Sequence, residues 1–285
     1  MYYLKKQITM NKCKFLAIAA IAAATVMTSC SKDEVENNNA DGKLSFASQV
    51  SNDPQARATS GNTWDGGETV IVNVSGTTYP FTVAADLSTL TSPTLYWNDY
   101  TSIDAFAYYP ETYAYAADQS AGIQAADFIF ADKVTGITRA NWGTQTLTFK
   151  HKTAKVSVTL TAGTGLAAGD LTGATVKFYG YTALAAMDIT GANPTGAITG
   201  STIGEITPDA GNTALLLPVT LTSENIFKVT LANPSGQEYY YKGSYTFEAG
   251  KSYQFTVQVD KTSLTVKSAN IQDWDSPIAG SGTAE

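Results

Sequence analysis

Apolar and polar residues alternate with a period of two along much of this chain, which is the pattern of half-buried β-strands. The clearest run is Tyr253–Val259, where Tyr, Phe and two Val residues alternate with Gln, Thr and Gln. Lys43–Val50 and Lys155–Thr161 alternate in the same way. No convincing apolar period of 3.6 residues extends beyond two turns. The pattern therefore predicts an all-β protein of short strands, joined by turns rich in Gly, Pro and Asn as in β-sandwiches.

The alternation changes phase in the middle of the chain. Phe149 and His151 share one parity, whereas the apolar residues of Lys155–Thr161 lie on the other. Since a shift of one residue moves every side chain of a strand to the opposite face, we predict a bulge or a sharp bend between Lys150 and Ala154.

A segment rich in Gly, Ala and Thr, Ala162–Gly173, separates two strand-rich halves of similar length. We therefore expect an N-terminal β-sandwich domain over residues 43–162 and a C-terminal one over residues 163–285. The Ala-rich stretch Tyr113–Ala126 lacks alternation and is expected to form a long loop or a short helix.

The first 29 residues have the layout of a secretory signal peptide: a basic start, the apolar run Phe15–Met27 and then small residues. The apolar run, about 13 residues, is too short to span a bilayer comfortably as a permanent helix. Met10 lies closer to this run than Met1 does, so the sequence leaves two candidate translation starts.

Met27-Thr28-Ser29-Cys30 resembles a bacterial lipobox, in which the cysteine sulfur receives a diacylglyceryl group. We therefore expect lipidation at Cys30 and anchoring in outer-membrane lipid; ordinary signal-peptide cleavage beside an incidental cysteine is the alternative. Residues 30–42 are polar and Asn-rich and are predicted to form a tether. Within them, Ser31-Lys32-Asp33-Glu34 resembles an acidic surface-export signal, or is a plain solvated charge run.

Charge and cysteine content exclude several classes of function. The net charge is −7, and without the four lysines of the leader 14 basic and 25 acidic residues remain, a net charge of −11. So acidic a protein repels nucleic acid, which is therefore not an expected partner. Of the two cysteines only Cys30 would survive cleavage, so the mature body has neither a disulfide nor a thiolate metal site.

No constellation of catalytic residues stands out, and we expect neither an enzyme nor a cofactor. His151 is the single histidine and is expected to be structural. No Gly-x-Ser-x-Gly motif is present. Asp273-Trp274-Asp275 lacks the spacing of a calcium loop. The clusters Tyr108-Tyr109 and Tyr239-Tyr240-Tyr241 are either sugar-stacking platforms or the cover of sandwich faces.

Taken together, the motifs and their order resemble those of the fimbrillin-like family, the lipoprotein precursors of fimbrial subunits in anaerobic gut and oral bacteria. The motifs that carry the resemblance are the lipobox Cys30, Thr63-Trp64-Asp65-Gly66-Gly67-Glu68, Phe106-Ala107-Tyr108-Tyr109-Pro110, Phe149-Lys150-His151-Lys152-Thr153-Ala154-Lys155-Val156, Ala214-Leu215-Leu216-Leu217-Pro218, Glu248-Ala249-Gly250-Lys251-Ser252-Tyr253 and Ile271-Gln272-Asp273-Trp274.

The resemblance implies two tandem transthyretin-like β-sandwich domains and a structural or adhesive role in surface fimbriae. It implies that a trypsin-like protease cuts the lipidated precursor after an arginine in the loop behind the first strand. Here that cut corresponds to Arg57 and Ala58. Cleavage would remove Lys43–Arg57, including the strand Lys43–Val50, and would free the subunit from the outer membrane. The open groove would then be filled by a terminal strand of another fimbrial subunit.

The candidate donor strand lies at the C-terminal end, with Leu264, Val266, Ile271 and Trp274 as its apolar residues. The same segment is equally interpretable as the last strand of the second domain. An alternative function is that of a monomeric cell-surface lipoprotein that keeps its lipid and binds glycans through exposed aromatic residues.

Overall fold

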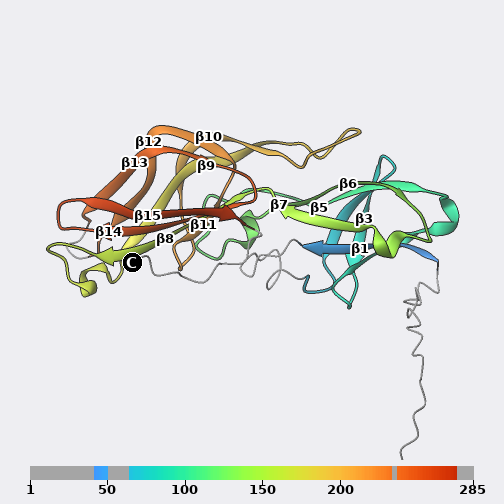
Figure 1. Ribbon diagram of the computed structural model, residues 1–285, viewed down its shortest axis with the longest axis horizontal. Helices are drawn as coiled ribbons and strands as arrows, with labels where there is room; N and C mark the ends of the chain where they lie inside the picture. Colours follow the sequence, from blue (N-terminus) through green and yellow to red (C-terminus); the bar gives the residue numbers. More distant parts are fainter. Residues whose placement is uncertain (1–41, 51–63, 233–235, 275–285) are drawn as a thin grey trace, which may run out of the picture. The chain divides into compact units, whose positions relative to one another are not determined.

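The computed structural model describes residues 42–50, 64–232 and 236–274, which form two groups of β-strands (Figure 1). Cys30, Arg57, Ala58, the leader and the tether lie outside these residues. The strands, in chain order, are β1 Lys43–Val50, β2 Thr69–Val74, β3 Thr77–Val83, β4 Thr89–Tyr96, β5 Ile103–Tyr109, β6 Ile129–Ile137, β7 Thr146–His151, β8 Ala154–Ala162, β9 Thr175–Met187, β10 Ile198–Ile206, β11 Thr213–Leu216, β12 Val219–Thr230, β13 Glu238–Phe247, β14 Lys251–Val259 and β15 Leu264–Asp273.

The helical elements among the described residues are four short 3-10 turns, so the all-β prediction is confirmed. They are η1 Trp97–Asp99, η2 Gln124–Ala126, η3 Trp142–Thr144 and η4 Ala168–Leu171. The Ala-rich stretch Tyr113–Ala126 is the long loop allowed for by the sequence, with η2 at its end. Within the described ranges, no helix has the length and apolar character that crossing a membrane requires.

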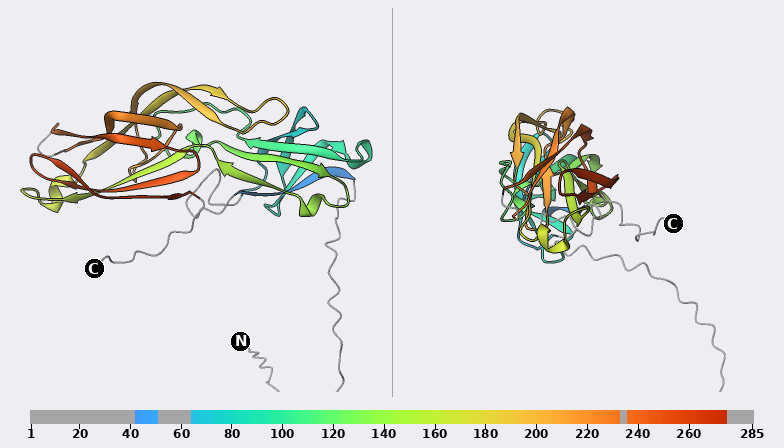
Figure 2. Two further views of the ribbon diagram at one scale, coloured as in Figure 1. Left: turned by 45° about the horizontal axis from the view of Figure 1, so that its top comes forward. Right: turned by 90° about the vertical axis from the view of Figure 1, so that its left-hand side faces the viewer.

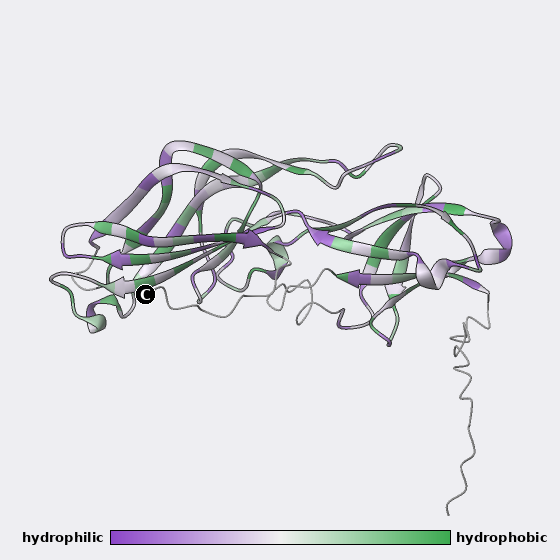
Figure 3. Cartoon of the chain, viewed as in Figure 1, coloured by the Kyte–Doolittle hydropathy of each residue, from purple (hydrophilic) through white to green (hydrophobic). Residues whose placement is uncertain are grey.

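The first group of strands forms a closed barrel in the order β1-β4-β3-β2-β5-β6-β7. The N-terminal β-sandwich expected from the sequence is closed, because β1 pairs antiparallel with β4 and parallel with β7 and so joins the two ends of the sheet. Inward-facing residues such as Phe46, Val72 and Phe149 are fully buried in one core, which follows from the period-two alternation of the strands. Figure 3 shows apolar residues recurring along these strands.

The second group is a sandwich of two four-stranded sheets, β10-β9-β12-β13 and β11-β8-β14-β15. Its core takes residues from both sheets, including Phe178 and Phe227 of the first and Phe255 of the second. Figure 2 shows the two sheets from further directions. The strands β10, β13, β11 and β15 lie at the ends of the sheet orders.

The chain passes from the barrel to the sandwich between β7 and β8. β7 ends at His151 and β8 begins at Ala154, so the interruption predicted from the change of phase is present as a change of sheet. β8 pairs with β11 and β14 of the sandwich. β8, which the boundary expected at Ala162–Gly173 assigns to the N-terminal domain, thus belongs to a sheet of the sandwich.

The loop between β9 and β10 reaches residues of the barrel. Lys133 Nζ on β6 donates to the carbonyl oxygen of Ala192 at 3.2 Å, and Lys152 Nζ donates to that of Thr195 at 2.8 Å. Gly196 adopts a φ of +66°, and a Cβ added there would lie 2.2 Å from Cγ of Phe130. Only glycine fits both the left-handed backbone and this close approach.

Candidate functional site

Strand β1 is an integral part of the barrel, although residues 1–41 and 51–63 lie outside the described part of the chain. Leu44 and Phe46 are fully buried, and Val50 is 5% exposed. Burial of each of these side chains stabilises the fold by about 1.5 to 3 kcal/mol relative to leaving it in water. The sequence predicted this strand with the bounds observed.

The backbone of β1 is paired on both edges. Phe46 lies opposite Leu90 of β4, and Val50 lies beside Phe149 of β7. The phenyl ring of Phe46 packs against that of Phe81, with centroids 5.3 Å apart. Loss of β1 would therefore leave two unpaired strand edges, β4 and β7, on either side of an apolar groove.

The strand β7 depends on β1 for much of its pairing. Residues Thr146 to Phe149 pair with β1, whereas pairing with β6 is confined to Phe149, Lys150 and His151. Gln49 adds a side-chain hydrogen bond from Nε2 to Oγ1 of Thr148 at 3.0 Å. In the part of the chain that the structure describes, the first three residues of β7 therefore have β1 as their ladder partner.

The candidate donor residues lie on and just after β15, which is the last strand of the sandwich in this structure. β15 pairs antiparallel with β14 from Leu264 to Asp273. Leu264 and Val266 are half-buried against the sandwich core, and Ile271 is 53% exposed. Trp274, directly after the strand, is 1% exposed.

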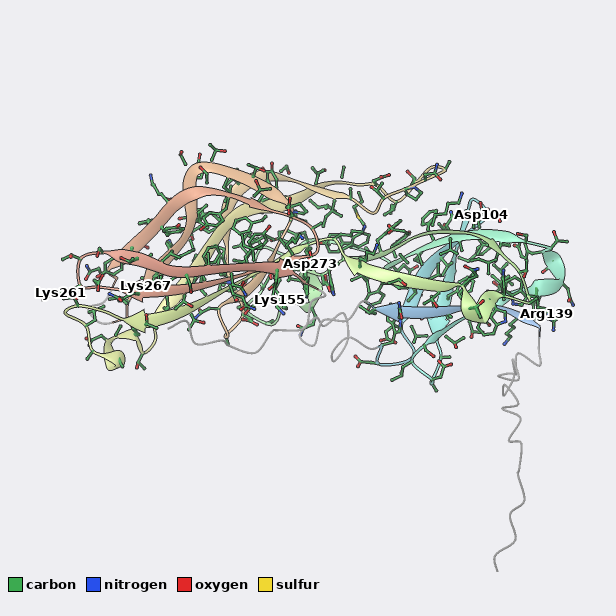
Figure 4. All side chains as sticks on the ribbon, viewed as in Figure 1. Asp104, Arg139, Lys155, Lys261, Lys267 and Asp273 are labelled. Carbon is green, nitrogen blue, oxygen red and sulfur yellow. The ribbon has the colours of Figure 1, made fainter. Side chains whose placement is uncertain are left out.

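The side chain of Trp274 stacks on that of His151, the last residue of β7. The indole and imidazole rings are stacked, with centroids 4.0 Å apart and an angle of 11° between their planes. Lys155 lies on β8, and its Nζ is 5.7 Å from the centroid of the same indole. Figure 4 labels Lys155 on β8 and Asp273 at the end of β15. The backbone N–H of Trp274 donates to the carbonyl oxygen of Gly250 at 2.7 Å.

His151 is buried and hydrogen-bonded to a carboxylate, which is typical of a structural histidine. Its Nδ1 is hydrogen-bonded to Oδ1 of Asp127 at 3.1 Å, and Oγ1 of Thr153 donates to the same oxygen at 3.3 Å. Nε2 of His151 has no hydrogen-bond partner among the described residues. No group of three or more His, Cys, Asp or Glu residues in the described ranges has the arrangement of a metal site.

Four of the five tyrosines in the two clusters are buried or half-buried. Tyr108 and Tyr109 are half-buried, and the Tyr109 ring meets the indole of Trp64 edge-on at 5.7 Å. Tyr239 is buried, while its neighbour Tyr240 is 45% exposed, because successive residues of a strand face opposite sides.

The outer face of the sheet β10-β9-β12-β13 carries a polar ladder. Lys228 Nζ lies 2.6 Å from Oε1 of Glu205 and 3.3 Å from Oε1 of Glu238. Hydrogen bonding to Lys228 holds the pKa of Glu205 below its ordinary value of 4.5. The phenols of Tyr179 and Tyr240 donate to the same two carboxylates. These side chains satisfy one another across four strands, which is the usual way in which exposed charges stabilise a sheet surface.

A model of the fimbrillin-like family matches residues 55–274 of the chain. The chain is also similar to the crystal structure of a Bacteroides uniformis protein assigned to cell adhesion. The identity is 25% and the TM-score 0.61, over 82% of this chain and 98% of that one. A Bacteroides ovatus protein with the same assignment has 16% identity and a TM-score of 0.51, over 81% of this chain and 97% of that one, and supports the fold alone. No curated protein matches the chain.

Proposed function

The chain belongs to the fimbrillin-like family, and we propose that it is a structural and adhesive subunit of surface fimbriae that assembles by strand exchange. In this proposal the precursor is lipidated at Cys30, held in the outer membrane and exposed at the cell surface. A trypsin-like protease cuts after Arg57, which removes β1 and separates the body from its lipid. The function requires neither a cofactor nor catalysis by this chain.

The observation that carries the proposal is the position of β1 in the barrel. β1 has a ladder partner on each side and a buried apolar face. Its covalent connection to the rest of the barrel runs through residues 51–63, which contain Arg57. Cleavage in this segment would leave β1 held by noncovalent contacts alone. A strand from another subunit could then replace it, because an open groove of this kind presents both unpaired backbone groups and apolar pockets.

The segment that best fits the groove is β15. Leu264, Val266 and Ser268 repeat the spacing of Leu44, Phe46 and Ser48, the inward-facing residues of β1. β15 lies at the end of its sheet, with β14 as its single ladder neighbour in the described chain. Donation of β15 from one copy to the groove of the next is a head-to-tail contact that does not close, so repetition would give a fibre.

Cleavage at Arg57 can be tested cleanly, because the chain contains only two arginines, Arg57 and Arg139. The purified precursor is treated with an arginine-specific protease, and the first cut is mapped by mass spectrometry. We expect the first cut after Arg57, followed by laddered oligomers on standing. Arg57→Ala should abolish both effects, and Arg139→Ala should leave both unchanged. A first cut after Arg139, or a protein that stays monomeric after cleavage at Arg57, would refute the proposal.

Glycan binding by a monomeric lipoprotein stays an alternative prediction, and the described residues favour it less. Of the five tyrosines in the two clusters, Tyr240 alone is exposed, and its hydroxyl already donates to Glu238.

A further inference from the structure

β15 is held by its ladder with β14, and the one fully buried side chain of Leu264–Trp274 is that of Trp274. Along Leu264–Asp273 the side chains are exposed or half-buried, whereas Trp274 is 1% exposed. The indole packs with Ile123 and Leu215 as well as on the imidazole of His151. Since a buried aromatic ring carries far more apolar contact than a half-exposed Leu or Val, Trp274 is the main anchor of the strand.

The ring on which Trp274 stacks belongs to the barrel, whereas Leu215 and Lys155 on its other sides belong to the sandwich. His151 is the last residue of β7, and its imidazole is fixed by Asp127, which follows η2 in the barrel half of the chain. Strand β7 in turn has three ladder positions paired with β6 and four paired with β1, of which Phe149 belongs to both sets. Removal of β1 would convert β7 from a doubly paired strand into an edge strand with three pairs, all at its His151 end.

We propose that the stack of Trp274 on His151 is a latch that keeps β15 docked in its own sandwich, and that β1 holds this latch closed through β7. Loss of β1 then loosens β7, disturbs the seat at His151 and lowers the cost of releasing β15. The groove that receives a strand and the strand that is donated would thus become available in response to the same event. This last step rests on the proposed function, whereas the latch itself is a property of the uncleaved chain.

The latch can be tested in the full-length precursor by hydrogen exchange of the backbone amides of residues 264–273, followed by mass spectrometry. His151→Ala and Trp274→Leu each remove one side of the stack and should speed exchange in β15 by at least about tenfold. The matched control is Ile271→Ala, an apolar truncation on the same strand that is already exposed to solvent, which should leave the exchange of neighbouring amides within about twofold. Trp274→Phe keeps an aromatic ring on His151 and should restore most of the protection.

Coupling to β1 is tested with Phe46→Ala, which weakens β1 without touching β15. We expect faster exchange in both β7 and β15. The control is Val72→Ala, a truncation at a fully buried residue of β2, a strand that pairs with β3 and β5 and not with β1 or β7. It should destabilise the barrel while leaving the exchange in β15 unchanged.

Unchanged exchange in β15 for both His151→Ala and Trp274→Leu would overturn the latch. Equal acceleration of β15 by Phe46→Ala and Val72→Ala would overturn the coupling through β7, because general destabilisation would then explain it. None of these measurements uses cleavage or polymerisation. A failure here therefore leaves the test at Arg57 untouched, and a failure at Arg57 leaves the latch untouched.

Discussion

Truncation of Phe46 is the sharpest test of how firmly β1 belongs to the barrel. The side chain is fully buried, packs against Phe81 and lies on a strand that is paired on both edges. If β1 is an integral strand, then Phe46→Ala should act like a truncation in the centre of a core.

The magnitude follows from the burial and from the rigidity of the site. Removing a buried Phe side chain costs about 3 to 5 kcal/mol, of which the contact with a second aromatic ring accounts for about 0.5 to 1.5 kcal/mol. Because ladders on both sides fix the backbone of β1, the barrel cannot collapse into the space left behind. We therefore expect the free energy of unfolding of the barrel to fall by about 4 kcal/mol.

Urea unfolding followed by tryptophan fluorescence measures this loss. Three of the four tryptophans of the chain, Trp64, Trp97 and Trp142, belong to the barrel core, so the signal reports mainly on the barrel. The control is Gln49→Ala, which removes an exposed hydrogen bond from the same strand and should cost less than about 1 kcal/mol. A loss for Phe46→Ala no larger than that for Gln49→Ala would refute the account of β1 as a structural strand.

Three further predictions concern other parts of the chain. Gly196→Ala should destabilise the protein by about 2 to 4 kcal/mol, because the strain of a left-handed backbone and overpacking against Phe130 act together. Gly191 has a φ of +92° and open space around it, so Gly191→Ala should show the backbone effect alone. Thermal unfolding of the two variants measures the difference. Lys228 lowers the pKa of Glu205, so the stability that it confers is present above pH 4.5 and is lost as the pH falls through the lowered pKa. Lys228→Met should accordingly have a lower free energy of unfolding than the parent protein at pH 7, and this difference should vanish in acid. Urea unfolding at both pH values measures it, and a difference that is the same at both would contradict the prediction. Cys30→Ala should abolish incorporation of labelled palmitate in cells, and labelling that persists would exclude this residue as the lipid site.

The sequence patterns predict where strands lie along the chain better than they predict which strands pair with each other. Lys43–Val50 is predicted with the observed bounds because its alternation is flanked by breakers on both sides. Of the apolar residues expected in the C-terminal strand, Leu264, Val266 and Ile271 lie on β15, and Trp274 directly follows it. Alternation defines which face of a strand is buried but not which strand lies beside it. The parallel pairing of β1 with β7, about 100 residues away, therefore could not be predicted, and neither could closure of the barrel.

The sheet to which β8 belongs and the stack of Trp274 on His151 could not be predicted, for related reasons. The alternation of β8 is the same whether the strand belongs to the barrel or to the sandwich, so the Gly-rich segment after it was the more visible candidate. The stack of Trp274 on His151 joins residues 123 positions apart, and no local pattern marks it. Asp127, the partner of His151, lies between η2 and β6, and nothing in the local sequence marks it as a partner of His151.

N-terminal sequencing of native subunits tests the central claim, that β1 is a removable part of the fold, most directly. Subunits recovered from sheared surface fimbriae should begin at Ala58, and membrane-bound precursor should begin at acylated Cys30. Polymerised subunits that begin at Cys30 and still carry Lys43–Val50 on the same chain would contradict the account.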